Sequence, residues 1–208
     1  MTMRNETEYI TMITKKLILV VSPPACGKTY VSKKIAGALD HVVYLDKDTV
    51  IPLSRKVFEA ANEEWNRSSD FFQRMVRDVE YEVILDIAFE ALEYEDLVLV
   101  NAPFTREIRD LEYVKALSKK LEKLGAKLTF VWVDASPETC HQRMIERNSN
   151  RDTWKLANWD EYIKGVDFSV PTPLSNPDSG ATLIYFDNDS TETFEKVLKE
   201  TVDILQNK

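Results

Sequence analysis

A short segment near the N-terminus, SPPACGKT at residues 22–29, constrains the fold more than any other part of the chain. Five apolar residues, 17–21, precede it, and residues with helical spacing follow it. A strand, a glycine-containing loop and a helix in this order are the setting of the phosphate-binding loop, whose template is Gly-x-x-x-x-Gly-Lys-Ser/Thr. The second half of the template is intact here, whereas Ser22 stands where the first glycine belongs.

The loop keeps the backbone donors that a phosphate needs. N–H groups that converge at a helix N-terminus bind an anion, and the last five positions of the loop supply most of them. All five residues at these positions retain an N–H: Ala25, Cys26, Gly27, Lys28 and Thr29. Pro23 and Pro24 lack one, but they fall in the ascending limb of the loop and stiffen it. Ser22 is acceptable if its backbone avoids a conformation open only to glycine.

These residues predict a nucleotide site. Lys28 would reach the β- and γ-phosphates, and the Thr29 hydroxyl would bind Mg²⁺. Tyr30 follows in the first helical turn and belongs to the same predicted nucleotide-binding set. The alternative is an ordinary strand–turn–helix connection with a solvent-facing lysine.

The rest of the chain alternates short β-rich runs with helical segments. Continuous apolar character is typical of strands that are covered on both faces, and it is found at 16–22, 42–46, 97–102, 127–134 and 181–187. Helices are expected at about 27–39, 53–66, 70–94, 106–124, 136–148 and 190–206. This alternation predicts a three-layer α/β fold, with a mostly parallel sheet of about five strands between two layers of helices. The Pro- and Ser-rich segment 169–180 is predicted to be a surface loop.

Composition and charge limit the partners. A chain of 208 residues is expected to form a single domain, 1–208. Residues 1–15 form a polar leader rather than a signal peptide, and no apolar run approaches the ~20 residues that span a bilayer. A formal net charge of −8 argues against broad binding to nucleic acid. Two cysteines cannot form a disulfide framework, which favours a cytoplasmic location.

Missing motifs exclude one class of nucleotide-binding protein. Signalling GTPases carry Asn-Lys-x-Asp and a strand-end Asp-x-x-Gly, and neither pattern occurs in this chain. Machines that convert hydrolysis into work usually carry further domains, for which we expect no room here. Transfer to a small acceptor is the simplest use of the site. It requires a carboxylate near the acceptor hydroxyl and positive charge around the moving phosphoryl group.

Two carboxylates follow the second expected strand, in LDKD at residues 45–48. Asp46 and Asp48 are separated by one residue, so both side chains can leave the strand on the same side. Ligands bind at the carboxyl ends of the strands in such sheets. We predict that Asp48 is the general base and that Asp46 helps to hold Mg²⁺. The alternative is a turn in which aspartates cap the following segment.

Positive charge follows the fourth expected strand. Arg143, Arg147 and Arg151 recur every four residues, which places them on one helical face if the helix persists. We predict that residues 138–159 form a lid over the nucleotide, with Arg143 among the nucleotide-binding residues. A solvated helix face paired with nearby glutamates is the alternative.

The acceptor side is expected between residues 50–80 and the end of the third strand. Segment 50–80 mixes arginines with aromatic residues and is either a helical cap over the acceptor or an amphipathic helix pair that closes the sheet. Arg55, Asn101 and Arg106 are the predicted acceptor-binding residues. Asn101 also stands where many P-loop enzymes carry an acidic residue for Mg²⁺, which would leave that charge to Asp46.

Three segments together resemble the P-loop kinase group that includes the phage-type polynucleotide 5′-hydroxyl kinases. They are SPPACGKT, LDKD and RNSNRDT (residues 147–153), in the order and approximate spacing of that group over residues 17–165. The resemblance implies that Lys28 and Thr29 serve ATP and Mg²⁺, that Asp48 is the general base, and that Arg147 and Arg151 clamp the phosphates. Polynucleotide kinases place an arginine for the substrate phosphate where this chain has Ile51, which argues against a nucleic-acid substrate.

The sequence therefore predicts an ATP-dependent kinase that transfers the γ-phosphoryl group to a hydroxyl of a small molecule, with ATP and Mg²⁺ as cofactors. A nucleoside or polynucleotide 5′-hydroxyl kinase is the alternative among enzymes. A regulatory module that binds a nucleotide and hydrolyses it slowly is the alternative of another class. Neither the acceptor nor the oligomeric state is indicated by the sequence.

Overall fold

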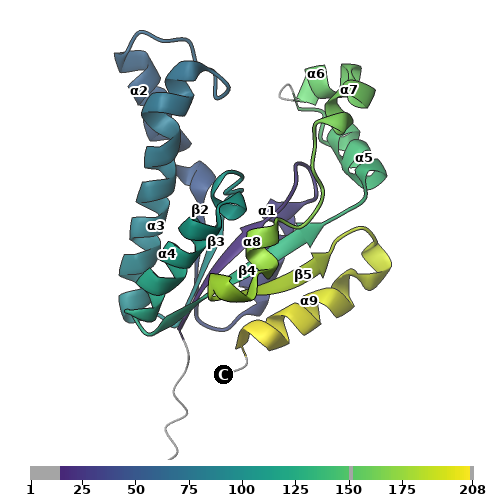
Figure 1. Ribbon diagram of the computed structural model, residues 1–208. Helices are drawn as coiled ribbons and strands as arrows, with labels where there is room; N and C mark the ends of the chain where they lie inside the picture. The colour runs from purple at the N-terminus through teal and green to yellow at the C-terminus, as the bar shows by residue number, and fades with distance from the viewer. Residues whose placement is uncertain (1–14, 150–151, 207–208) are drawn as a thin grey trace, which may run out of the picture.

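Five parallel strands form one central sheet (Figure 1). The structure, a computed structural model, describes residues 15–149 and 152–206. The strand order is β2-β3-β1-β4-β5. The strands are β1 Lys15–Val21, β2 Val42–Asp46, β3 Leu97–Asn101, β4 Ala126–Asp134 and β5 Ala181–Asp187. All five expected strands are confirmed to within about one residue at each end, and the sheet is parallel throughout.

Helices cover both faces of the sheet, which confirms the three-layer arrangement (Figure 1). The helices are α1 Lys28–Ala38, α2 Ile51–Ala60, α3 Arg77–Tyr94, α4 Leu111–Glu122, α5 Pro137–Arg147, α6 Thr153–Ala157, α7 Trp159–Lys164, α8 Thr172–Ser175 and α9 Thr191–Gln206. One core lies between the sheet and helices α3, α4 and α8, and a second lies between the sheet and helices α1, α5 and α9. In β1, Leu17 and Leu19 belong to the first core, whereas Ile18 and Val20 belong to the second. Burial on both faces accounts for the continuous apolar run that precedes the glycine loop.

The sheet register aligns the strand ends from which the site is built. Asp46, the last residue of β2, lies opposite Asn101, the last residue of β3, and Asn101 lies opposite Val20 of β1. The glycine loop begins two residues after Val20. The parallel register therefore places the carboxyl ends of β2 and β3 beside the loop.

Two expected elements differ from those observed, and a third ends where the sequence predicts. The helix expected at 53–66 ends at Ala60, and Asn62 follows in a left-handed conformation with φ 55°. The helix expected at 136–148 is α5, which ends at Arg147 because Asn148 adopts φ 44° as its C-cap, so the condition that the helix persists to the third arginine is not met. Asparagine is one of the few residues that adopt this conformation routinely. The segment expected to be a loop, 169–180, contains α8 and a 3₁₀ turn, Pro177–Ser179.

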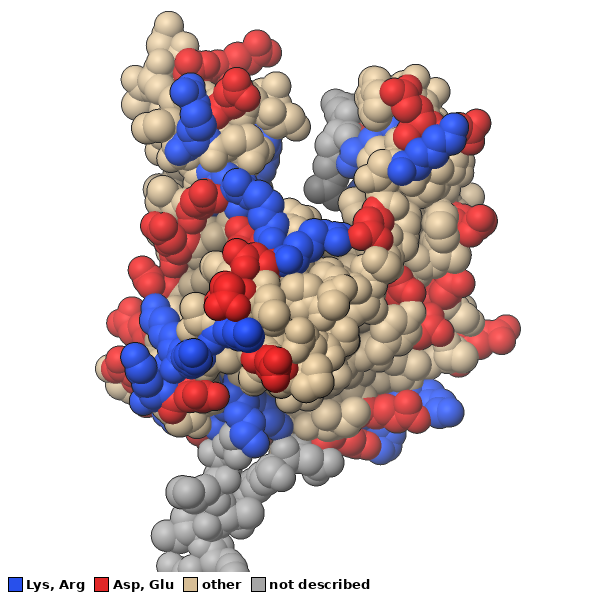
Figure 2. Space-filling view, viewed as in Figure 1, with Lys and Arg blue, Asp and Glu red and all other residues tan. Residues whose placement is uncertain are grey.

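Two arms extend beyond the carboxyl edge of the sheet (Figure 1). The first arm contains α2, a π-helical turn at Phe72–Val76 and the start of α3. The second arm contains α5, α6 and α7. Figure 2 shows that the surface is hollowed between the arms, with basic side chains across the base of the hollow. Within the described residues, no helix has the length and apolar character needed to cross a membrane.

Candidate active site

The glycine loop has the geometry of an anion site. Gly27 adopts φ 86° and forms the N-cap of α1 without a side-chain cap, and the first turn of the helix carries no acidic residue. The first N–H groups of a helix have no acceptor within the helix, so this end of α1 suits a phosphate. Ser22 is not among the described residues with positive φ, so serine satisfies the condition set for this position. Within the described glycine loop, the non-glycine residue with a strained, left-handed backbone is Ala25, with φ 67°.

Arg143 of α5 and Asn188, which follows β5, hold the glycine loop. The carbonyl of Cys26 accepts hydrogen bonds from Asn188 Nδ2 at 2.8 Å and Arg143 Nη1 at 3.3 Å. Arg143 also donates from Nη2 to the Asn188 carbonyl at 2.6 Å. A Cβ atom added at Gly27 would lie closer to Asn188 Nδ2 than real Cβ atoms approach. Gly27 is therefore required for its conformation and for the space that Asn188 occupies.

A pair of buried thiols adds to this contact. Cys26 Sγ lies 3.4 Å from Cys140 Sγ of α5, and both side chains are fully buried. The hydrogen bond that the two thiols share, together with burial, raises the pKa of Cys26. A protonated, enclosed thiol is a packing group rather than a nucleophile.

Asn101 connects the loop to the carboxylates at the end of β2. Its amide oxygen accepts a hydrogen bond from the ammonium group of Lys28. Its amide nitrogen lies within hydrogen-bond distance of Asp46 Oδ2 at 3.0 Å, of Thr29 Oγ1 at 3.3 Å and of the Tyr44 hydroxyl at 3.3 Å. Burial, and then the charge of Asp46, raise the pKa of Tyr44 to about 12. The structure thus brings together four residues that the sequence placed in two separate parts of the site: Lys28, Thr29, Asp46 and Asn101.

Thr29 and Asp46 fit a magnesium ion. Within residues 15–149 and 152–206, no group of three or more His, Cys, Asp or Glu side chains could hold a metal alone. Magnesium keeps several waters and is usually bound through one or two carboxylates plus substrate phosphates, so it needs no such group. The Thr29 hydroxyl and the Asp46 carboxylate are both within hydrogen-bond distance of the Asn101 amide nitrogen, so the two groups lie close together.

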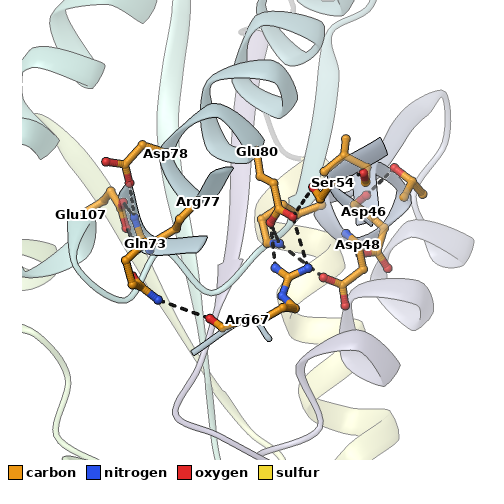
Figure 3. Close-up of polar contacts among 12 residues, drawn as sticks. Asp46, Asp48, Ser54, Arg67, Gln73, Arg77, Asp78, Glu80 and Glu107 are labelled. Atoms are coloured by element: carbon orange, nitrogen blue, oxygen red, sulfur yellow. Dashed lines mark hydrogen bonds and ion pairs between the residues drawn. The ribbon is translucent and has the colours of Figure 1, made fainter. Parts of the chain in front are cut away.

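Asp48 lies beside a buried ion cluster (Figure 3). Its side chain is 63% exposed, and Lys47 Nζ approaches it at 3.4 Å. Lys47 is itself buried and pairs with Glu80 at 2.8 Å, and Arg67 donates two hydrogen bonds to the same carboxylate at 3.2 and 2.7 Å. Ser54 donates a fourth at 2.7 Å. Burial alone would raise the pKa of Glu80, but the hydrogen bonds from Lys47 and Ser54 and the positive charges of Lys47 and Arg67 lower it.

A second set of ion pairs connects α3 to the turn after β3 (Figure 3). Arg77 donates to both carboxylate oxygens of Glu107, at 2.6 and 3.0 Å, and to Asp78 at 2.8 Å. Arg106, a predicted acceptor-binding residue, donates to Asp78 at 2.6 Å, and both side chains are exposed. The structure therefore places Arg106 at the base of the first arm, with its charge already partnered.

Arg55, a predicted acceptor-binding residue in α2, places its guanidinium carbon 5.0 Å from the centre of the Trp65 ring. Trp65 and Phe71 pack against a small core of Phe58, Phe72 and Val76. These aromatic side chains fill the interior of the arm, as in the amphipathic alternative. The sequence left open whether segment 50–80 is also a cap, and its position beside the hollow is compatible with that role.

Arg143 and Arg147 both lie in α5 but have different partners. Arg143 contacts the glycine loop, whereas Arg147 donates two hydrogen bonds to Asp152 Oδ2 at 2.9 and 2.6 Å. Asp152 is completely buried, and Lys155 lies 3.5 Å from its other oxygen. Arg151 lies outside the described residues. Tyr30, a predicted nucleotide-binding residue, packs its ring against that of Phe194 in α9, with the ring centroids 5.4 Å apart.

Sequence reasoning missed three residues that support the site: Asn188, Cys140 and Glu80. Asn188 follows directly after β5, so the rule that functional residues follow strand ends in a parallel sheet would have found it. Glu80 carries no such signal, because it lies within the long helix α3 and its role depends on buried ion pairs with Lys47 and Arg67 that form only in the folded chain.

Comparison with known proteins identifies a family and several solved structures that this chain resembles. A family model described as an AAA domain, AAA_33, matches residues 17–168. Comparison with curated proteins found no match. Among solved structures, a presumed kinase from Chloroflexus aurantiacus J-10-fl is 20% identical with a TM-score of 0.59, over 93% of this chain and 100% of that one. A sugar kinase from Janibacter sp. HTCC2649 is 12% identical with a TM-score of 0.52, over 90% and 92%.

At these identities the two structures show the fold alone, which is the α/β fold of P-loop kinases. The family match covers the glycine loop, the Asp46–Asn101 contact and helices α5, α6 and α7 of the second arm. The chain therefore belongs to the AAA_33 family of P-loop domains.

Proposed function

We propose that the protein is a kinase that transfers the γ-phosphoryl group of ATP to a hydroxyl of a small molecule. The observation that carries the proposal is the network in which Asn101 connects Lys28, Thr29 and Asp46 at the mouth of the glycine loop. A lysine for the β- and γ-phosphates lies there beside a hydroxyl and a carboxylate suited to Mg²⁺. A simple structural turn has no need for this combination of groups.

The proposed roles follow from position and charge. The N–H groups of residues 25–29 and the Lys28 ammonium bind the phosphates, and Thr29 and Asp46 hold Mg²⁺, which neutralises charge on the phosphates when bound. Asp48, exposed at the end of β2, accepts the proton of the acceptor hydroxyl. The acceptor oxygen then forms a bond to the γ-phosphorus, and the bond to the β–γ bridging oxygen breaks with its electron pair remaining on ADP.

Charge pairing supports a small acceptor over a polynucleotide. A polyanion is bound through a row of available cations, because neutralised phosphates supply most of its affinity. Three arginines around the first arm are instead partnered by carboxylates: Arg67 by Glu80, Arg77 by Glu107 and Arg106 by Asp78. The net charge of −8 acts in the same direction.

The proposal is tested with Lys28→Ala beside Lys33→Ala, an exposed lysine of the same helix. Calorimetry measures ATP binding with Mg²⁺, and a coupled assay measures ADP release over a panel of hydroxyl compounds. We expect acceptor-dependent ADP release with a phosphorylated product. Lys28→Ala should lower it on the order of 10²–10³-fold, while Lys33→Ala changes little. Nucleotide binding with slow hydrolysis that no acceptor stimulates would favour a regulatory module instead.

A further inference from the structure

Lys47 is a buried lysine that none of the roles above uses. It follows Asp46 directly and begins a 3₁₀ turn, Lys47–Val50, between β2 and α2. Its side chain is 3% exposed. The ammonium nitrogen lies 2.8 Å from Glu80 Oε2 and 5.5 Å from the centre of the Tyr81 ring, and both of these residues belong to α3. The end of β2 is therefore tied to α3 through a cation whose position is fixed by its surroundings.

The cluster around Glu80 holds more positive than negative charge. Lys47 and Arg67 both pair with the buried Glu80 carboxylate, at 2.8 and 2.7 Å. Arg67 donates two hydrogen bonds and Ser54 donates another, so Glu80 would keep partners without Lys47. Burial of an ammonium group is costly unless the charge is paired. A second carboxylate beside Lys47 balances the charge that Glu80 alone cannot.

Asp48 is that second carboxylate. Lys47 Nζ lies 3.4 Å from Asp48 Oδ1, and Figure 3 shows Asp48 at the edge of the cluster. The backbone N–H of Asp48 donates to Asp46 Oδ1 at 3.0 Å. Asp48 is thus held at two points, one on its side chain and one on its backbone. The side-chain contact engages Oδ1 and leaves Oδ2 for a proton donor.

We propose that Lys47 is a positioning residue for proton transfer: it holds Asp48 Oδ1 so that Asp48 Oδ2 faces the acceptor hydroxyl. The inference rests on the proposed kinase function and on Asp48 as its general base. The hydroxyl proton passes to Oδ2 while the hydroxyl oxygen forms its bond to the γ-phosphorus. Lys47 keeps its own proton and acts on the reaction through Asp48.

The same contacts connect the base to the phosphate site. Asp46 accepts a hydrogen bond from the Asp48 N–H through Oδ1 and another from Asn101 through Oδ2. Asn101 in turn accepts from Lys28. A continuous series of contacts therefore runs from the glycine loop through both aspartates to α3. Because a displacement of about 1 Å can cost on the order of 10²-fold in rate, the packing of α3 bears directly on the position of the base.

Two variants that each remove one cation from Glu80 test the proposal. Lys47→Met removes the ammonium group and leaves Glu80 with Arg67 and Ser54. Arg67→Met is the matched control, because it also takes one cation from Glu80 but leaves the contact between Lys47 and Asp48. Lys47→Met is made in the native chain and in the Asp48→Asn background. The probes are D-glucose, glycerol, L-serine and adenosine, and kcat, the acceptor KM and ATP affinity are measured below the Tm of every variant.

We expect Lys47→Met to lower kcat on the order of 10–10²-fold with ATP affinity nearly unchanged. Arg67→Met should keep kcat within about twofold of the native value. In the Asp48→Asn background, Lys47→Met should change the remaining kcat by less than about twofold, because residues that act as a unit are not additive. Both single variants should lower Tm, since each removes one partner of a buried carboxylate.

The inference is overturned by a native kcat in Lys47→Met, by an equal loss of kcat in both single variants, or by the same loss from Lys47→Met in the Asp48→Asn background. If Lys47→Met does not fold, Glu80→Asp takes its place. It keeps the charge but shortens the side chain by one methylene, which draws Lys47 away from Asp48; kcat should fall, and a native kcat would overturn the inference. If the native chain phosphorylates no probe, or Asp48→Asn is fully active, the kinase function or its base is wrong, and the inference falls with it.

Discussion

Asn101 Nδ2 donates a hydrogen bond to Asp46 Oδ2 over 3.0 Å, and the two residues lie directly opposite each other in the β2–β3 register. The neutral amide donates to the Asp46 carboxylate and adds no like charge beside it. The same amide presents its oxygen to Lys28, so one side chain contacts both signs of charge.

Replacing this amide with a carboxylate should make stability depend on a divalent cation. In Asn101→Asp two carboxylates meet at hydrogen-bond distance, and like charges this close repel by a few kcal/mol at an effective dielectric constant near 20. Lys28 offsets part of the repulsion. We expect the Tm of the variant to fall by several degrees without Mg²⁺ and to recover when MgCl₂ is added. Thermal unfolding of the native chain, Asn101→Asp and Asn101→Leu with and without Mg²⁺ measures this, and an equal Mg²⁺ response in all three would contradict it.

Asp46, the last residue of β2, and Asp48, two residues later, should have different effects on the kinetics when each is replaced. Asp48→Asn is expected to lower kcat by 10²–10⁴-fold with ATP affinity nearly unchanged, because a general base acts on the acceptor. Asp46→Asn is expected to raise the Mg²⁺ concentration needed for half-maximal rate. Steady-state rates at graded Mg²⁺, with calorimetry for ATP, distinguish the variants. The roles are reversed if Asp46→Asn is inactive at saturating Mg²⁺ while Asp48→Asn is mild.

Alanine substitutions at the arginines of the second arm should differ in whether they weaken ATP binding or lower kcat. Arg143→Ala removes hydrogen bonds to the Cys26 and Asn188 carbonyls, so it should weaken ATP binding and leave kcat less affected. Arg151→Ala should lower kcat by up to 10³–10⁵-fold, as for an arginine aimed at the transferring group, and Arg151→Lys should rescue little because it lacks the planar fork. Arg147→Ala should also lower kcat. Near-native kcat in the Arg147 and Arg151 variants would mean that this is a solvated face.

Two glycines of one helical segment should respond to alanine in opposite directions. Gly27→Ala forces a side chain into a left-handed conformation, which costs about 1–2 kcal/mol before the clash with Asn188 is added. Gly37→Ala adds a Cβ that meets nothing within 4 Å, inside α1, and should stabilise the chain by up to about 1 kcal/mol. Urea unfolding measures both, and ATP binding should be lost only in Gly27→Ala. A Gly27→Ala protein with native stability and ATP affinity would refute the loop geometry.

The buried cluster around Glu80 should contribute to acid sensitivity. Its pKa is lowered in the folded state, so its contribution to the free energy of unfolding is complete above the ordinary carboxyl pKa of 4.5 and is lost as pH falls through the lower folded value. Glu80→Gln removes the carboxylate that pairs with both Lys47 and Arg67, leaving Lys47 only its 3.4 Å contact with Asp48, and should cost about 3–5 kcal/mol at pH 7. That difference from the native chain should shrink below about pH 4.5. Glu59→Gln, which removes an exposed pair with Lys56, should stay within about 0.5 kcal/mol at every pH; a constant Glu80→Gln difference would contradict the assignment.

Sequence patterns predicted the elements that depend on periodicity and turn chemistry. The strands were predictable because burial on both faces leaves a continuous apolar run, as at Leu17–Val21. The end of α5 was predicted to within one residue, at 148, although the four-residue spacing of the arginines continues past the Asn148 cap. The carboxylate partners of Arg67, Arg77 and Arg147 were invisible, since each pairing joins residues through tertiary packing or a turn rather than a repeat. Asn188 lies 162 positions from the loop it supports.

The register that aligns Val20, Asn101 and Asp46 has a consequence for chain length. Side chains alternate between the faces of a strand, so one added or deleted residue within β2 or β3 turns every later side chain to the opposite face. Asp46 and Asn101 would then separate even though both remained in the sequence. For protein engineering, this part of the molecule should accept exchanges of side chains far more readily than insertions, and new segments are better placed in the turns at the amino ends of the strands, such as the one before β2.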